Sequence, residues 1–265
     1  MKRSRVFTCL FLTLSLLGAG CDASYTSPPI STVSTPHASL QVGSWNTVAE
    51  GLSRREDENI LSSTASLIVY RFEAGHFSVS FADATSTGRI SDWRGASTSS
   101  VAIINGEYFQ PNGLPSGFLI TGGELFPSHP FDLARSGFVI GGASSTIIST
   151  SSTTSFMQRT EVLQSYPYLV KDGKADVSSE SGKSARRSFV GFDASNNLYL
   201  GVVENGDVTL HELSSYLAGM EVHWKNVLNL DGGPSTGLSV QDGEWSETID
   251  SWTSIPNVLM VKRLK

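Results

Sequence analysis

Runs of β-branched and aromatic residues recur along most of the chain, and several of them alternate with polar residues. A period of two is typical of strands, in which successive side chains point to opposite faces. The runs are short and are separated by turn residues, which favours a fold dominated by strands. The pattern predicts strands at residues 66–72, 77–81, 101–104, 117–120, 125–126, 198–204, 208–210, 227–230 and 258–261.

Two residue pairs between these runs are typical of tight turns. Gly122-Gly123 separates the runs at 117–120 and 125–126, and Asn205-Gly206 separates those at 198–204 and 208–210. Both pairs favour the backbone conformations of two-residue hairpin loops. We therefore expect two hairpins at these positions.

Helical periodicity is limited to two segments. Residues 211–220 carry apolar side chains at helical spacing, and residues 50–61 form a second candidate helix. The Ser- and Thr-rich residues 143–155 predict a loop or an exposed edge. The fold class is therefore α+β, a mostly antiparallel or mixed β-sheet with a few helices. We expect it to form one domain over residues 41–265.

The N-terminus has the composition of an export signal. A basic head is followed by a dozen apolar residues, small residues and Cys21, which predicts a signal peptide over residues 1–20. A cysteine in this position resembles the lipobox of bacterial lipoproteins, so Cys21 is the predicted lipidation site. Gly18 departs from that pattern, which usually has leucine there, and ordinary signal cleavage with an incidental Cys21 is the alternative. Residues 21–40, rich in Ser, Thr and Pro, predict a tether. The expected location is periplasmic or cell-surface, with a lipid anchor as the contact with a membrane.

The charge narrows the range of partners. The formal net charge is −6 and the chain has no long basic run, which argues against a nucleic-acid partner. The other cysteine, Cys9, lies in the predicted signal peptide, so no internal disulfide is expected. The five histidines are scattered without zinc-ligand spacing, so no metal or other cofactor is expected. Calcium held by oxygen ligands stays an open alternative.

Two predicted strands end abruptly in polar residues and glycines. One runs into Asn105-Gly106-Glu107-Tyr108-Phe109, and the other runs through Asn229-Leu230 into Asp231-Gly232-Gly233. Polar groups at the ends of strands are held by a rigid sheet, and glycines let backbone amides approach a ligand. Tight turns capped by Asn105 and Asp231 are the structural alternative for either segment.

A third segment contains the adjacent pair Arg186-Arg187 just before an apolar strand. Adjacent arginines are usually solvated, but an inward guanidinium suits a phosphate or carboxylate. The segment 233–237 also fits the G-x-S-x-G pattern of serine hydrolases. That pattern needs a following helix and a later histidine, whereas residues 238–243 predict a strand and a turn, and no histidine follows His223.

Taken in this order, the segments resemble the phosphodiester glycosidase family, with coverage from about residue 45 to the end. The resemblance depends most on Asn229-Leu230-Asp231-Gly232-Gly233. It also rests on the segments 105–109, 115–118, 166–170, 187–191 and 255–259.

The resemblance implies hydrolysis of a sugar-1-phosphodiester at the anomeric carbon of an envelope or extracellular glycan. It implies Asp231 as the carboxylate that stabilises the sugar cation, attacks it or activates water, three roles that the sequence leaves open. It implies Glu107 as a second catalytic carboxylate and Arg187 as the group that neutralises the phosphate. The other implied substrate-binding residues are Asn105, Gly106, Tyr108, Arg186, Asn229, Gly232, Gly233, Ser235 and Thr236.

Two positions depart from the family pattern. Glu107 stands where the family usually has a glycine, and Pro234 stands where it often has glycine or serine. A carboxylate at position 107 either adds to the catalytic groups or fills a subsite. The alternative function is therefore a non-catalytic module that binds envelope polysaccharide or assists exopolysaccharide assembly.

Overall fold

The computed structural model describes residues 32–33, 40–62 and 64–265. In this part of the chain the strands form three sheets, and every strand pairing is antiparallel. The predicted class, mostly antiparallel sheet with few helices, is confirmed. The predicted signal peptide, Cys21 and most of the predicted tether lie outside the described residues.

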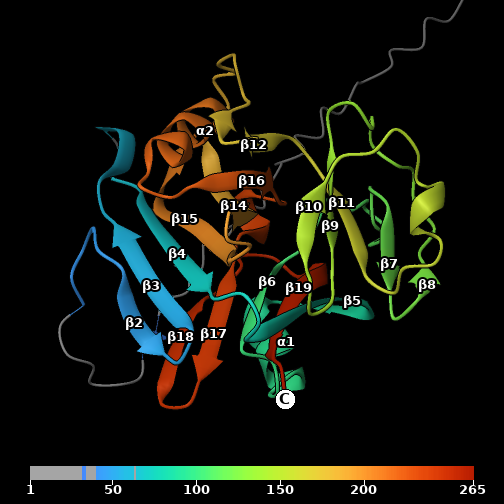
Figure 1. Cartoon of the computed structure of the whole chain (residues 1–265), viewed down its shortest axis with the longest axis horizontal. Helices are drawn as coiled ribbons and strands as arrows, with labels where there is room; N and C mark the ends of the chain where they lie inside the picture. Colours follow the sequence, from blue (N-terminus) through green and yellow to red (C-terminus); the bar gives the residue numbers. More distant parts are fainter. Residues whose placement is uncertain (1–31, 34–39, 63) are drawn as a thin grey trace, which may run out of the picture.

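The largest sheet has eight strands in the order β13-β12-β16-β14-β15-β4-β3-β2 (Figure 1). Its strands are β2 (Asn46–Ala49), β3 (Leu52–Asp57), β4 (Ser66–Phe72), β12 (Tyr168–Lys171), β13 (Lys174–Ala175), β14 (Ala185–Asp193), β15 (Leu198–Val208) and β16 (Trp224–Asn229).

The second sheet has six strands in the order β1-β18-β17-β6-β19-β5. Its strands are β1 (Thr32–Val33), β5 (Phe77–Gly88), β6 (Ala102–Asn105), β17 (Leu238–Asp242), β18 (Trp245–Ile249) and β19 (Ile255–Arg263). β1, within the range predicted as a tether, pairs with β18.

The third sheet has five strands in the order β10-β9-β11-β7-β8 and lies on the right in Figure 1. Its strands are β7 (Leu119–Thr121), β8 (Glu124–Leu125), β9 (Gly137–Ile140), β10 (Thr146–Ile148) and β11 (Val162–Ser165). β10 is an edge strand in the segment predicted as a loop or exposed edge.

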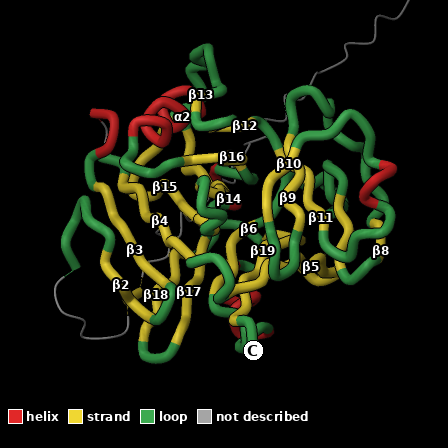
Figure 2. The backbone as a smooth tube through the Cα atoms, viewed as in Figure 1, coloured by secondary structure: helices red, strands yellow, loops and turns green. Residues whose placement is uncertain are grey.

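Helices are few, as Figure 2 shows. They are α1 (Ile90–Ala96), α2 (Leu210–Gly219) and the 3₁₀ turns η1 (Ile60–Ser62), η2 (Thr154–Phe156) and η3 (Gly233–Ser235). α2 confirms the helix predicted at 211–220, and its first turn is held by a capping box between Thr209 and Glu212. No helix among the described residues is long and apolar enough to span a bilayer.

The main core lies between the sheets. Ile68 and Tyr70 of β4 pack in a cluster that also contains Ala102 of β6 and Leu163 of β11, so all three sheets contribute. The opposite face of the eight-stranded sheet, including Val69, packs against α2. Both faces of β4 are therefore covered, which explains why residues 66–72 form a nearly continuous apolar run.

The helix predicted at residues 50–61 is wrong, because most of this segment forms β3 and η1. Arg54 of β3 is only 4% exposed and donates two 2.8 Å hydrogen bonds to Glu247 of β18. Tyr70 also donates to Glu247. The charged residues of this segment thus include a buried bridge between two sheets.

The hairpin predicted at Asn205-Gly206 is also wrong, because β15 continues through these residues. The pairing of β14 with β15 shifts register between Ala185 and Arg187, so Asn205 and Gly206 form a bulge. A Cβ at Gly206 would lie 2.8 Å from the backbone nitrogen of Ala65, which excludes larger residues. The hairpin at Gly122-Gly123 is confirmed, since β7 pairs with β8.

Candidate active site

The ends of three strands meet at the side chain of Asn105, the last residue of β6. Its Oδ1 accepts hydrogen bonds from the Ser188 hydroxyl of β14 at 2.6 Å and from the Gly237 backbone at 3.2 Å. Its Nδ2 donates to the Asp231 carbonyl at 2.7 Å. Asn105 is 1% exposed, so its side-chain amide joins the loop of Asp231 to Gly237 from the interior of the protein.

Asp231 follows β16, and the loops fix both its backbone and its carboxylate. Its backbone nitrogen donates to the Gly106 carbonyl at 3.1 Å, and its Oδ1 accepts from the Gly232 nitrogen at 2.9 Å. Burial raises the pKa of Asp231, while hydrogen bonds from Ser235 and Gly232 oppose that shift. The half-buried carboxylate is therefore oriented and only partly solvated.

The Arg187 guanidinium lies beside this loop. Its Nε donates to the Val208 carbonyl at 3.0 Å and its Nη2 to the Lys183 carbonyl at 2.6 Å. Its Nη1 lies 3.8 Å from the position that a Cβ on Gly232 would occupy. The Val208 and Lys183 carbonyls thus fix the guanidinium of Arg187, so that its Nη1 faces the loop that contains Gly232.

Tyr108 connects the two charged groups. Burial raises the pKa of the Tyr108 hydroxyl, the charge of Asp231 raises it further, and the charge of Arg187 lowers it. Tyr108 is therefore within electrostatic range of both and stays protonated at neutral pH. Its hydroxyl accepts a 2.5 Å hydrogen bond from Asn229 and donates to the Tyr166 carbonyl at 3.2 Å.

Two aromatic residues that the sequence patterns did not single out extend the site. The ring centroids of Tyr166 and Phe131 lie 5.3 and 6.0 Å from that of Tyr108. Phe131 and Tyr166 line a pocket of about 220 Å³ together with Asp132 and Arg135. Tyr166 belongs to a family-like segment, but nothing in the sequence near Phe131 indicates a site.

Glu107 is not on the surface of the site. It is 1% exposed, its Oε2 accepts a 2.6 Å hydrogen bond from the Gly117 nitrogen, and its Oε1 has no partner among the described residues. Burial raises the pKa of Glu107 well above its usual range, with further contributions from Asp83 and Asp231. Glu107 is therefore an inward-facing carboxyl group whose protonated form is favoured by burial, while the hydrogen bond from Gly117 opposes that shift.

Arg186 and Arg187 point to opposite faces of β14, as successive strand residues do. Arg186 is 5% exposed, and its guanidinium lies 4.7 Å from the ring of Trp252. The Trp252 backbone nitrogen in turn donates to the Pro234 carbonyl at 2.8 Å. The structure thus directs only the Arg187 side chain towards Tyr108 and Gly232.

Several buried polar atoms at these loops lack a hydrogen-bond partner among the described residues. Buried polar atoms are nearly always paired, so such a concentration is typical of a ligand or water site. The atoms are Glu107 Oε1, Asn229 Oδ1, Thr236 Oγ1 and both amide atoms of Asn257. Asn229, Ser235 and Thr236 are at most 5% exposed, so they support the loops from within.

The glycines allow the two loops to approach each other. A Cβ at Gly106 would overlap the Asn257 amide, and a Cβ at Gly232 would lie 2.9 Å from the Arg186 carbonyl. Gly233 has a φ of +59°, which larger residues rarely adopt. Within the described ranges no group of three or more His, Cys, Asp or Glu side chains is arranged to hold a metal ion.

A family model for phosphodiester glycosidases matches residues 98–262. These residues contain both glycine loops and the arginine pair. No curated protein matches the chain.

Two solved structures have a similar fold. The catalytic domain of zebrafish N-acetylglucosamine-1-phosphodiester alpha-N-acetylglucosaminidase, auto-inhibited by its pro-peptide, is 16% identical, with a TM-score of 0.58 over 88% of this chain and 87% of that one. A protein from Synechocystis is 15% identical, with a TM-score of 0.60 over 82% of this chain. The chain spans 62% of the length of the Synechocystis protein.

Proposed function

The chain belongs to the phosphodiester glycosidase family, and from this premise we propose that it hydrolyses a sugar-1-phosphodiester at the anomeric carbon. The observation that carries the proposal is the convergence of Asp231, Tyr108 and Arg187. An oriented carboxylate and an oriented guanidinium, both within electrostatic range of one phenol, match the two charges that develop in this reaction.

The reaction breaks the bond between the anomeric carbon and a phosphate oxygen. The sugar acquires oxocarbenium-like positive charge, and the departing phosphate monoester takes the bonding electrons. Asp231 is positioned to stabilise the positive sugar, and water supplies the new hydroxyl. A phosphate leaves readily, so neutralising its charge assists departure more than a strong acid does.

Arg187 is the group for that neutralisation. Because the Val208 and Lys183 carbonyls hold its Nε and Nη2, the free Nη1 can face a phosphate oxygen without losing side-chain entropy on binding. The backbone amide of Gly233 is an additional donor, whereas those of Asp231 and Gly232 already donate to the Gly106 carbonyl and to Asp231 Oδ1. The Tyr108 hydroxyl donates to the Tyr166 carbonyl, so it would donate to a sugar or phosphate oxygen only by exchanging that partner.

Glu107 is assigned a positioning role. A carboxyl group that accepts a hydrogen bond from Gly117 and is 1% exposed supports the loop after β6 and does not reach a substrate. The natural setting remains the exported, lipid-anchored one predicted from the N-terminus and Cys21. There the substrate would be an envelope or extracellular glycoconjugate.

The test is turnover by the purified full chain on methyl phosphodiesters of α-N-acetylglucosamine and on UDP-sugars, measured as released reducing sugar. Asp231→Asn is expected to lower kcat by about 10²–10⁴-fold with an unchanged circular dichroism spectrum. Asp172→Asn, at an exposed turn with φ +47°, is the matched control. Lack of turnover by the wild type across a varied sugar panel, together with saturable glycan binding, would favour the non-catalytic module.

A further inference from the structure

Two adjoining pockets lie beside the aromatic residues of the candidate site. The pocket of about 220 Å³ lined by Phe131 and Tyr166 shares Asp132 with a second pocket of about 830 Å³. Phe131 and Tyr166 pack beside Tyr108, so the smaller pocket lies next to the proposed reaction centre. We call the two pockets together the side groove.

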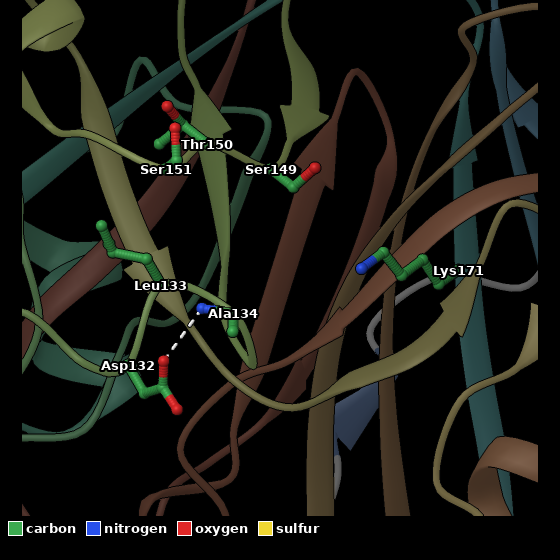
Figure 3. Close-up of a pocket in the computed structure, with 7 residues that line it drawn as sticks. All are labelled: Asp132, Leu133, Ala134, Ser149, Thr150, Ser151 and Lys171. Atoms are coloured by element: carbon green, nitrogen blue, oxygen red, sulfur yellow. Dashed lines mark hydrogen bonds between the residues drawn. The ribbon is translucent and has the colours of Figure 1, made fainter.

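The side groove runs between two sheets. One wall is the segment between β8 and β9, which carries Asp132, and another is residues 149–151, which follow β10. Lys171, the last residue of β12, contributes from the eight-stranded sheet. In Figure 3 the Lys171 amine extends towards Ala134, and the hydroxyls of Ser149, Thr150 and Ser151 lie along the wall.

The walls of the side groove are polar and carry hydrogen-bonding groups on three consecutive residues. Ser149, Thr150 and Ser151 offer hydroxyls that donate and accept, as sugar hydroxyls do. Thr150 also donates to the Ser152 carbonyl at 2.9 Å, which orients its side chain. The size of the larger pocket is in the upper part of the range for small-molecule sites, so it exceeds what one scissile bond requires.

The side groove also carries two cations in an acidic protein. Arg135 lines the smaller pocket and Lys171 the larger one, and neither forms a salt bridge within the described residues. The Lys171 amine lies 5.0 Å from the ring centroid of Tyr168, which holds it at the wall. Asp132 is the acid among the lining residues, and its Oδ1 accepts from the Ala134 nitrogen at 3.0 Å.

We propose that the side groove binds further units of an extended anionic glycan, whose scissile phosphodiester lies at Asp231. This rests on the proposed function and specifies its substrate class: a chain with negative groups beyond the reacting bond. The hydroxyl wall contacts sugar units, the Phe131 and Tyr166 rings stack on them, and Arg135 and Lys171 face the charges. The negative groups are phosphodiesters or carboxylates, which both cations bind.

The expected preference for an anionic substrate can be calculated from the interactions of Arg135 and Lys171 with its charges. A solvent-exposed charge pair contributes about 0.2–1 kcal/mol, and salt screens it. Two such contacts correspond to roughly a 2- to 30-fold preference for an anionic chain over a neutral one. The preference belongs to the side groove, whereas hydrolysis belongs to Asp231, so the two can be measured separately.

The experiment compares three substrates of the full chain: a methyl sugar-1-phosphodiester, an oligomer of phosphodiester-linked sugars, and a neutral oligosaccharide carrying one terminal phosphodiester. For the wild type, kcat/KM for the anionic oligomer is expected to exceed that for either other substrate by about 5- to 10-fold at low salt. The Arg135→Gln/Lys171→Gln double variant should bring the ratio to about one, and 0.5 M NaCl should do the same. Lys262→Gln, an exposed change on β19 of the six-stranded sheet, is the control.

Equal kcat/KM for all three substrates in the wild type, or an unchanged ratio in the double variant, would overturn the proposal. Binding of a fluorescent anionic oligomer to Asp231→Asn separates this failure from that of the proposed function. Lys171-dependent binding without any turnover by the wild type supports the side groove and contradicts the hydrolase. A uronate oligomer of equal charge identifies the source: equal binding indicates recognition of charge, and weaker binding indicates recognition of phosphate.

Discussion

The Ser188 hydroxyl donates a 2.6 Å hydrogen bond to Oδ1 of Asn105 and so joins β14 of the eight-stranded sheet to β6 of the six-stranded sheet. Both residues are at most 1% exposed. The other end of the Asn105 amide donates to the Asp231 carbonyl. The side chain of Asn105 therefore fixes the loop of Asp231, the proposed catalytic carboxylate, relative to both sheets.

Asn105→Ala is expected to impair both stability and turnover. It leaves the Ser188 hydroxyl, the Gly237 amide and the Asp231 carbonyl without this partner, at about 1–3 kcal/mol for each buried unpaired group. Small displacements of a reacting group lower rates by up to about 10²-fold, so we expect kcat to fall by about 10- to 100-fold. Urea unfolding and steady-state kinetics are the measurements.

Ser188→Ala is the matched comparison, since it removes only one of these hydrogen bonds. It should cost about 1 kcal/mol and leave kcat within a few-fold of the wild type. A larger decrease in kcat for Ser188→Ala than for Asn105→Ala would contradict the conclusion that Asn105 is the main support of the Asp231 loop.

Glu107→Gln should change the pH dependence of stability. Burial raises the pKa of Glu107 in the folded protein above its usual value of 4.5, so the folded state holds a proton that the unfolded chain releases. Stability is thus fully present below about pH 4.5 and declines as the pH rises towards the raised value. Glutamine keeps the acceptor for Gly117 and has no proton to lose.

We therefore expect similar melting temperatures for both proteins at pH 4.5 and a higher one for Glu107→Gln at pH 8. A chain of this size gains roughly 2–4 °C per kcal/mol. Burial also raises the pKa of Asp83 to about 6, so the informative quantity is the difference between variant and wild type. A difference in melting temperature between the two proteins that does not change with pH would show that Glu107 is ionised in the folded state.

The acidic limit of turnover should report Asp231. Its carboxylate must be ionised to stabilise a positive sugar, and burial raises its pKa above the usual 3.8. The value of kcat should therefore fall as the pH falls, with a midpoint above that of an ordinary aspartate. A pH–rate profile from pH 3.5 to 8 measures this, and a midpoint at or below 3.8 would exclude Asp231 as the limiting group.

The same profile for Glu107→Gln is the control. Since Glu107 is assigned no contact with the substrate, its replacement should leave an acidic limit in place. A limit that disappears in this variant would assign the titration to Glu107.

Gly106→Ala tests how closely the loops must approach. Its Cβ would overlap the Asn257 amide and lie 3.0 Å from the Asn257 carbonyl oxygen, so we expect a loss of about 1–3 kcal/mol and reduced turnover. Gly95 lies in α1 with no atom within 4 Å of a Cβ. Gly95→Ala should stabilise the protein by up to about 1 kcal/mol, because alanine favours helices. Thermal unfolding of both variants provides the comparison, and equal shifts would contradict it.

Much of the fold could be predicted from the sequence alone, because the local pattern of residue types indicates where strands and helices form. A run of β-branched and aromatic residues predicted β4 at residues 66–72, and the periodicity at 211–220 predicted α2. The glycine-rich segments after β6 and β16 predicted a close approach of backbones, and the space around Gly106 and Gly232 agrees, since a Cβ at either position would meet a neighbouring segment.

Long-range pairing decided the rest. Residues 50–61 were misread because Arg54 finds its partner Glu247 at a distance of 193 residues along the chain, which no local pattern reveals. Asn205-Gly206 became a bulge because β14 pairs with β15 on both sides of it. The packing of the three sheets also decided three features of the site. It directs Arg186 and Arg187 to different surroundings, buries Glu107 and places Phe131 beside Tyr108. Local sequence determines which backbone conformations are favourable, whereas burial, charge environment and distance between side chains exist only once the sheets are assembled.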